Sequence, residues 1–315
     1  MKVAICGTWH VHAGHYTQVA KDTEGVEVIG VYEENEEWKK EFAKNFDIPA
    51  FETFDDLLKS GADMAIVCSA TNKHHYYITE LAKAKIDIFT EKVLALTVED
   101  CEDIKKVIEE NGVKFVISFV HKCAGGIRTV KKLVSEGAVG KVNYVRFRNA
   151  HGGSYQGWLP EHFYNNQECG GGAMIDLGAH GMYIINDILG LPEKYNSTFT
   201  VCAPIEKNKD LVEDHAVTVM TYPDGAIAIN ETGFVSPSTP CMIEVGGEKG
   251  FVSYCEERGV ELNNESTEYD LKKVDSLDSI PEPLEQMLAG TILDGCGIDE
   301  AINLTKMMAG AYNGK

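Results

Sequence analysis

The sequence predicts an α/β domain with a parallel sheet, followed by an α+β domain with an open, mostly antiparallel mixed sheet. In residues 2–120, short apolar runs alternate with amphipathic helical stretches, which is typical of a parallel sheet covered on both faces. Residues 195–262 instead carry a series of β-like runs, and two helical stretches close the chain. We place one boundary near residue 120, which gives domains 1–120 and 121–315.

The first domain is expected to alternate strands and helices. Thr97 stands where the last of these helices should have its N-cap, and Asp100 three positions later nearly completes a capping box. The expected strands are Lys2–Cys6, Val26–Tyr32, Met64–Cys68, Asp87–Thr90 and Lys114–Ser118, and the expected helices are His12–Lys21, Glu36–Asn45, His74–Lys85 and Val98–Asn111.

The second domain is expected to mix helices with repeated strands. A Gly- and aromatic-rich loop covers His151–Gly172, and Pro223-Asp224-Gly225 is a turn signal between two strands. The expected strands are Lys141–Asn149, Phe199–Ala203, Ala216–Tyr222, Ala226–Glu231, Met242–Gly246 and Phe251–Cys255, and the expected helices are Gly126–Glu136, Ala173–Leu189, Pro283–Leu293 and Asp299–Tyr312.

Composition and charge exclude several classes of partner. The chain has 315 residues, 44% of them hydrophobic, and a net charge of 29 − 49 = −20, which repels nucleic acid and anionic membranes. A local nest of N–H groups can still hold a phosphate. The nine cysteines form no C-x-x-C pair, which argues against a zinc ribbon. Because the N-terminus shows no apolar leader and the thiols are scattered, we expect a cytoplasmic protein.

The turn after the first strand is a candidate site for a dinucleotide. In a doubly wound sheet this turn and the following helix N-terminus hold a pyrophosphate. Gly7 supplies the first glycine of the G-x-G-x-x-G pattern, but Trp9 and His12 occupy the other two glycine positions. This match is weak, and an ordinary tight turn explains Gly7 about as well.

An acidic residue at the end of the second strand strengthens the dinucleotide hypothesis. Glu33 lies where an acid accepts hydrogen bonds from the ribose hydroxyls and repels a 2′-phosphate, which favours NAD over NADP. The alternative is a solvated acid within the charge run Glu33–Glu37.

The pair His10 and His12 raises a metal hypothesis. An H-x-H at a strand end supplies two ligands in barrel-type metal-dependent hydrolases. That interpretation needs eight βα units, which the β-rich second half does not provide. We therefore keep a metal-dependent hydrolase as a less favoured alternative and expect no metal.

Three segments carry a family resemblance. They are Cys68–His75 (CSATNKHH), Phe89–Thr97 (FTEKVLALT) and Gly170–His180 (GGGAMIDLGAH). In this order the chain resembles the glucose–fructose oxidoreductase, inositol dehydrogenase and MocA (Gfo/Idh/MocA) family. The resemblance spans nearly the whole chain. It implies a Rossmann domain, an open-sheet second domain used in dimers or tetramers, NAD(P), and hydride exchange at a secondary alcohol or its ketone.

The resemblance also assigns candidate residues. The family's E-K-P motif reads Glu91-Lys92-Val93 here, and its D-x-x-x-H pair maps onto Asp176 and His180. Three positions depart from the pattern: Val93 replaces the proline, Tyr183 stands where an acid is common, and Trp9 stands in the glycine-rich turn. The predicted cofactor-binding residues are Gly7, Thr8, Trp9, His10, Val11, Glu33, Ser69, Thr71, Asn72, His75, Glu91 and Lys92.

The residue chemistry agrees with the resemblance. Asp176 and His180 are four positions apart, so a helix places them on one face. Histidine accepts a proton near neutral pH as hydride leaves, and Lys92 at a strand end can stabilise an alkoxide. Taken singly, each residue also has a structural explanation: a surface lysine, an acid near a helix N-terminus, or a core histidine.

Substrate contacts are predicted around the same residues and in the loop before the glycine run. Aromatic and polar side chains there suit a sugar ring, and they suit a buried interface equally. The candidates are His121, Lys122, Tyr155, Trp158, Glu161, His162, Asp176 and His180, with Tyr164 nearby.

The sequence thus predicts an NAD-dependent oxidoreductase acting on a sugar, cyclitol or related polyol, as a homodimer or homotetramer. Two alternatives stay open. A redox-neutral enzyme with tightly held NAD would oxidise, eliminate or hydrolyse, and reduce again within one turnover. A regulator that senses NAD(H) without turnover is disfavoured by retention of Lys92, Asp176 and His180.

Overall fold

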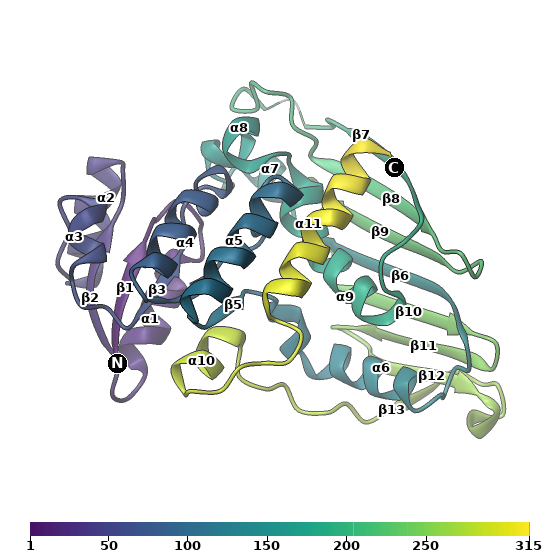
Figure 1. The fold of residues 1–315 in the computed structure, drawn as a ribbon. Coiled ribbons are helices and arrows are strands. Elements are labelled where there is room, and N and C mark those ends of the chain that lie inside the picture. Colours follow the sequence, from purple (N-terminus) through teal and green to yellow (C-terminus); the bar gives the residue numbers. More distant parts are fainter. Residues whose placement is uncertain (204, 238, 315) are drawn as a thin grey trace. The chain divides into compact units, whose positions relative to one another are not determined.

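The computed structural model describes residues 1–203, 205–237 and 239–314, and the chain divides into two compact units (Figure 1). The first unit combines Met1–Ser118 with Pro281–Thr305, and the second combines Phe119–Ile280 with Lys306–Lys315. The first unit is therefore assembled from two separate stretches of sequence.

A five-stranded parallel sheet forms the centre of the first unit, in the order β2-β1-β3-β4-β5. Outside β2, Ala50 adds one parallel bridge to Val31, at the place of a further edge strand. The strands are short and mostly buried, as expected when helices cover both faces of a sheet. Their bounds are β1 Lys2–Cys6, β2 Glu27–Tyr32, β3 Met64–Val67, β4 Asp87–Thr90 and β5 Phe115–Ile117.

Helices pack on this sheet in two groups. α4 lies beside α5, whereas α1 packs against α2 and α10 (Figure 1). Thr97 caps α5 by accepting the Asp100 N–H, as predicted, and Asn35 caps α2. The helices are α1 Ala13–Asp22, α2 Glu36–Phe46, α3 Phe54–Leu58, α4 His74–Lys83, α5 Val98–Asn111 and α10 Pro283–Leu288, with the short turn η1 at Thr71–Lys73.

The C-terminal segment completes the edge of this sheet. The Ile117 N–H of edge strand β5 donates to the Cys296 carbonyl at 2.9 Å, and α10 packs on β5. An uncovered edge strand exposes a row of backbone hydrogen-bonding groups, so residues 281–305 protect this edge.

An eight-stranded mixed sheet forms the second unit, in the order β13-β12-β11-β10-β6-β9-β8-β7. Of its neighbouring pairs only β6 and β9 run parallel. The predicted fold class is confirmed for both sheets. The strands are β6 Val142–Ala150, β7 Lys194–Thr200, β8 His215–Thr221, β9 Ile227–Gly233, β10 Met242–Gly247, β11 Gly250–Cys255, β12 Gly259–Asn264 and β13 Lys272–Val274.

Glycines bring the helices of the second unit close to its sheet. A Cβ on Gly181 would lie 2.0 Å from Asn230 Oδ1, and one on Gly126 would lie 2.1 Å from the Tyr254 ring. The helical elements are η2 Val120–Cys123, α6 Gly125–Ser135, α7 Gly153–Gln156, η3 Glu161–Tyr164, α8 Asn166–Cys169, η4 Met174–Gly178 (one π-helical turn), α9 Ala179–Leu189 and η5 Glu265–Thr267. The last helix, α11 Ile298–Asn313, belongs to the first unit up to Thr305 and to the second unit from Lys306.

Two features of the second unit differ from the sequence prediction. The strand expected at Phe199–Ala203 lies at Lys194–Thr200 instead. Polar residues alternate there with the inward-facing Tyr195 and Phe199, so the strand has a weak apolar signal in the sequence. The strands β12 and β13 were not predicted. Among the helices of the described residues, none has the length and apolarity to cross a membrane.

Candidate active site

The carboxyl ends of β1, β3 and β4 meet at one edge of the first sheet. The Cys68 N–H donates to the Cys6 carbonyl at 2.9 Å, and the Glu91 N–H donates to the Val67 carbonyl at 3.0 Å. Since β2 and β3 flank β1 on opposite sides, the strand order reverses between β1 and β3. Ligands of open α/β sheets bind at such a switch point, outside the carboxyl ends of the strands.

Gly7 allows two loops to approach each other closely at this edge. Its φ is +88°, and a Cβ there would lie 2.5 Å from both the N and the Cα of Ser69. Only glycine fits this position, because any side chain meets both backbone strain and a backbone clash. An ordinary tight turn needs a glycine for its positive φ but not for such close contact with a second loop.

Backbone strain alone at such a position costs about 1–3 kcal/mol. We expect Gly7→Ala to lower the free energy of unfolding by more than this, because the added Cβ also clashes with Ser69. Gly25→Ala is the matched control, since Gly25 has φ +78° with nothing within 4 Å of the added Cβ. Urea unfolding of both variants measures the difference. Equal losses would show that the clash with Ser69 is not real.

Glu33 is buried and hydrogen-bonded to the first turn. Its carboxylate accepts the Thr8 N–H at 2.7 Å, the Thr8 hydroxyl at 3.2 Å and the Asn35 N–H at 2.9 Å, and the residue is 8% exposed. The alternative of a solvated acid is therefore wrong for Glu33. Its contact with ribose stays a prediction.

Glu91 is the centre of a polar cluster behind the first turn. It is 1% exposed, and its Oε1 lies 2.7 Å from His12 Nδ1 and 2.5 Å from the Tyr16 hydroxyl. Burial raises the pKa of Glu91, but His10 and His12 outweigh it and hold the pKa well below its usual range. The carboxylate is thus ionised. Lys92 follows directly and is also buried.

The turn after β3 offers a group suited to a ligand. The Ser69 hydroxyl is buried, and within the described residues its Oγ has no hydrogen-bond partner. Such a group favours a bound polar molecule. Together with the cradle at Gly7, it fits a dinucleotide at this edge.

The remaining predicted cofactor contacts differ in their surroundings. Trp9 and Thr71 are buried, whereas Val11 and Asn72 are exposed. His75 pairs with Asp103 of α5 at 2.9 Å.

The glycine run Gly170–Gly172 is held by a buried acid that sequence reasoning missed. Glu213 accepts the Gly172 N–H at 3.0 Å, the Met174 N–H at 2.9 Å and the Tyr312 hydroxyl at 2.6 Å. These bonds fix the start of η4, which carries Asp176 and continues into α9. A π-helical turn of this kind is frequent at functional sites.

His180 on α9 is buried against Tyr183. His180 Nδ1 lies 2.9 Å from the Tyr183 hydroxyl, which also accepts the His121 N–H at 3.1 Å. The rings of His121 and His180 are 4.6 Å apart. Lys122 pairs with Asp187 at 2.8 Å. The second unit thus brings the predicted residues His121, Lys122 and His180 together around Tyr183.

The loop before the glycine run is arranged differently. Tyr155 and Trp158 are exposed, and the Trp158 indole N–H donates to Gln156 at 3.0 Å. Glu161 pairs with Lys209 at 3.5 Å. The neighbouring His162 has intermediate exposure. These residues stay substrate predictions.

Two further residues support the site although they were not among the predicted site residues. Tyr16 supports Glu91 from α1, and His74 lies within 3.2 Å of the carbonyls of Ser69, Val93 and Leu94. Tyr16 belongs to no motif, whereas the place of His74 in the Cys68–His75 segment was a signal that could have found it. Burial lowers the pKa of His74, and the carbonyls oppose this effect.

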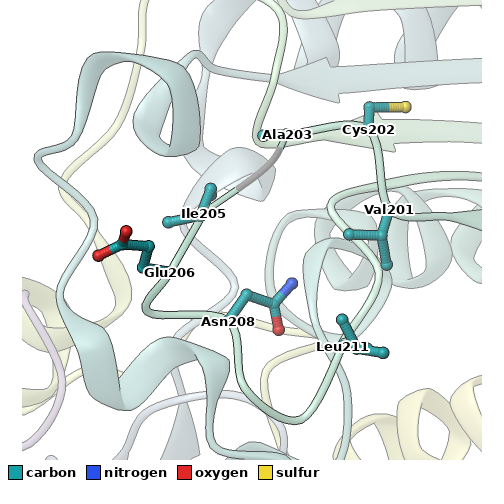
Figure 2. Close-up of a pocket in the computed structure, with 7 residues that line it drawn as sticks. All are labelled: Val201, Cys202, Ala203, Ile205, Glu206, Asn208 and Leu211. Carbon is teal, nitrogen blue, oxygen red and sulfur yellow. The ribbon is translucent and has the colours of Figure 1, made fainter.

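A pocket of about 410 Å³ lies in the loop after β7 (Figure 2). Val201, Ile205 and Leu211 give it an apolar lining. None of the residues that line it was predicted from the sequence as a site residue.

Comparison with known proteins matches both halves of the chain to one family of oxidoreductases. Residues 1–119 match the model of the oxidoreductase family with an NAD-binding Rossmann fold, and residues 127–253 match the GFO/IDH/MocA C-terminal domain. The aldose–aldose oxidoreductase of Caulobacter crescentus has the same fold, with a TM-score of 0.81, 19% identity and coverage of 99% of this chain and 96% of that one.

Two curated relatives match parts of the chain. One is the 2,7-anhydro-N-acetylneuraminate hydratase of Mediterraneibacter gnavus, 32% identical over 45% of this chain and 37% of the relative. The other is the myo-inositol 2-dehydrogenase of Thermotoga maritima, 27% identical over 64% and 60%. The chain thus spans less than two thirds of either relative. With its NAD-binding domain and its C-terminal domain both matched, the chain belongs to the Gfo/Idh/MocA oxidoreductase family.

Proposed function

We propose that the protein transfers hydride between NAD and a secondary hydroxyl, or the corresponding ketone, of a sugar, cyclitol or related polyol. The observation that carries this proposal is the buried Lys92 at the end of β4 in an NAD-binding unit, beside the ionised Glu91. In this proposal the first unit supplies the cation, Lys92, and the second unit supplies the proton acceptor, His180.

His180 is the proposed acid/base. Its Nδ1 faces Tyr183, so we assign proton transfer to Nε2. When NAD is bound it supplies the hydride acceptor. His180 takes the hydroxyl proton, Lys92 stabilises the developing charge on the oxygen, and Asp176 orients the substrate or the histidine. Substrate contacts are proposed for His121 and the loop residues named above.

Glu33 is the proposed determinant of NAD over NADP. We expect Glu33→Ala to lower the preference for NAD by about tenfold or more, since removing the carboxylate removes repulsion of a 2′-phosphate. Glu34→Ala is the matched control, because Glu34 is half-exposed and accepts the Tyr77 hydroxyl at 2.6 Å instead. Fluorescence titration with NADH and NADPH measures both. An unchanged preference in Glu33→Ala would mean that another residue reads the ribose.

The alternative is a redox-neutral enzyme with tightly held NAD that acts on a glycoside. The name of the Mediterraneibacter gnavus relative, a hydratase, favours keeping it. Denaturing the purified protein and identifying the released nucleotide, followed by a polyol and sugar panel, separates the two. Net NADH formation supports the dehydrogenase. Bound NAD with product but no net NADH supports the alternative, and a protein without nucleotide affinity contradicts both.

We also propose a homodimer or homotetramer formed through the second sheet. On one face of that sheet, Val219 of β8 pairs with Ile229 of β9, and neighbouring Ile227 is 42% exposed. A second copy would remove this apolar surface from water.

A further inference from the structure

We propose that His10, His12 and Glu91 form a binding site for one divalent transition-metal ion of the Zn²⁺ class. His12 Nδ1 and His10 Nδ1 lie 2.7 and 3.6 Å from Glu91 Oε1, and all three ligand atoms lie within 4.8 Å of one another. Two imidazole nitrogens and one carboxylate oxygen are a ligand set that zinc accepts. This site goes beyond the proposed hydride transfer and does not depend on it.

The local structure explains why these atoms converge. His10 and His12 are two positions apart on the turn after β1, and Glu91 follows β4 at the same edge of the sheet. The turn is held in place because the His10 N–H donates to the Cys68 carbonyl at 2.9 Å. The ligands therefore come from two segments that the sheet fixes.

The hydrogen bonds of the cluster already converge on the proposed ligand atoms. The lone pair of His10 Nδ1 accepts the His12 N–H at 3.2 Å, and Glu91 Oε1 lies 3.6 Å from this nitrogen and 2.7 Å from His12 Nδ1. A metal ion among these atoms would take the place of that N–H at His10 Nδ1 and of the proton between His12 and Glu91.

An outer layer of hydrogen bonds supports the carboxylate. The Tyr16 hydroxyl donates to Glu91 Oε1 at 2.5 Å and lies 2.7 Å from the Ser118 hydroxyl, and the Lys92 N–H donates to Glu91 Oε2 at 3.1 Å. Bonds of this kind orient metal ligands and raise metal affinity. The side chain of His12 is 41% exposed, which gives an ion a route to the buried Glu91.

Three protein ligands leave a fourth tetrahedral position for water or a ligand oxygen. Because the same turn is the expected pyrophosphate site, a bound ion and a dinucleotide share one loop. The proposal departs from our sequence prediction, which assigned no metal. That prediction treated His10 and His12 as a pair of ligands and did not place Glu91 beside them.

Titration of the purified 315-residue chain with Co²⁺ tests the site by visible absorption. We expect one Co²⁺ per chain with the bands of a four-coordinate ion bound by nitrogen and oxygen, and no sulfur-to-cobalt charge-transfer band. The absence of that band excludes binding by the nine cysteines. Metal analysis after dialysis against Zn²⁺ gives the stoichiometry independently.

The critical variant is His12→Gln, whose amide retains a hydrogen bond to Glu91 but ligates metal poorly. Losing a residue that only hydrogen-bonds to a metal ligand costs at least about tenfold in metal affinity. Since His12 is itself a proposed ligand, we expect the Co²⁺ affinity of His12→Gln to fall by more than this. His15→Gln is the control, since His15 is exposed and faces Glu282 instead. Tyr16→Phe should weaken binding by about tenfold and provides a second test if His12→Gln unfolds. No cobalt spectrum in the wild type, or an affinity equal to the wild type in both the His12 and the Tyr16 variants, would overturn the proposal.

Discussion

Replacement of His180 by alanine is expected to lower kcat by about 10²–10⁴-fold, the range for losing a general acid/base. The affinity for NAD should change little, because the substitution leaves the predicted pyrophosphate turn at Gly7 and the predicted ribose contact at Glu33 intact. Stopped-flow measurement of NADH formation, with a substrate identified from the polyol panel, gives the rate. Equilibrium titration gives the dinucleotide affinity.

The control for this experiment is His215→Ala in the same unit, where the histidine is exposed at the start of β8. Tyr183→Phe removes the hydroxyl that faces His180 Nδ1 and should shift the pH profile of kcat more than it changes KM. If His180→Ala retains near-normal turnover, the acid/base lies elsewhere.

Replacement of Lys92 is expected to lower kcat by about 10²–10³-fold, the range for losing one group that stabilises an oxyanion. Lys92→Met is the sharper variant, because it keeps much of the buried apolar stem while it removes the charge. The expected result is a fall in kcat with nearly unchanged NAD affinity, measured by the same two assays.

Lys83→Ala supplies the matched control, since Lys83 is exposed on α4 and pairs with Glu80 at 2.6 Å. A Lys92→Met enzyme that loses NAD affinity but keeps kcat would assign Lys92 to cofactor binding instead of to the chemical step.

The first sheet was predictable because each of its strands is a short apolar run. Val98–Asn111 was placed without error, since Thr97 and Gly112 mark its two ends. The contribution of residues 281–305 was not predictable. It depends on the bond between Ile117 and Cys296, which joins segments far apart in the sequence.

In the second unit, alternating strands were harder to place where the outward face is polar. β7 has only Tyr195 and Phe199 as large inward residues, and the prediction followed the more apolar stretch after it. β13 has three residues, of which two are lysines, so hydrophobic periodicity gives no signal there. Register along the sheet, not local sequence, places this strand.

Some residues of the candidate site could be predicted from the sequence and others could not. Lys92, Asp176 and His180 could be nominated because motifs carry them. Tyr183 was noted only as a departure from the family pattern, and Glu213 was not noted, because their roles arise from tertiary contacts with His180 and with the glycine run. The His10–His12 pair was visible in sequence, but its convergence on Glu91 requires the parallel pairing of the sheet.

The proposed hydride transfer requires Lys92 and His180 to act on one substrate oxygen beside the nicotinamide. A crystal structure of the protein with NAD and a substrate from the polyol panel would reveal whether they do. We expect Lys92 Nζ and His180 Nε2 both to lie within hydrogen-bonding distance of the same hydroxyl, whose carbon faces the nicotinamide ring. Lys92 and His180 on separate sides of the bound substrate, or a nicotinamide remote from both, would contradict it.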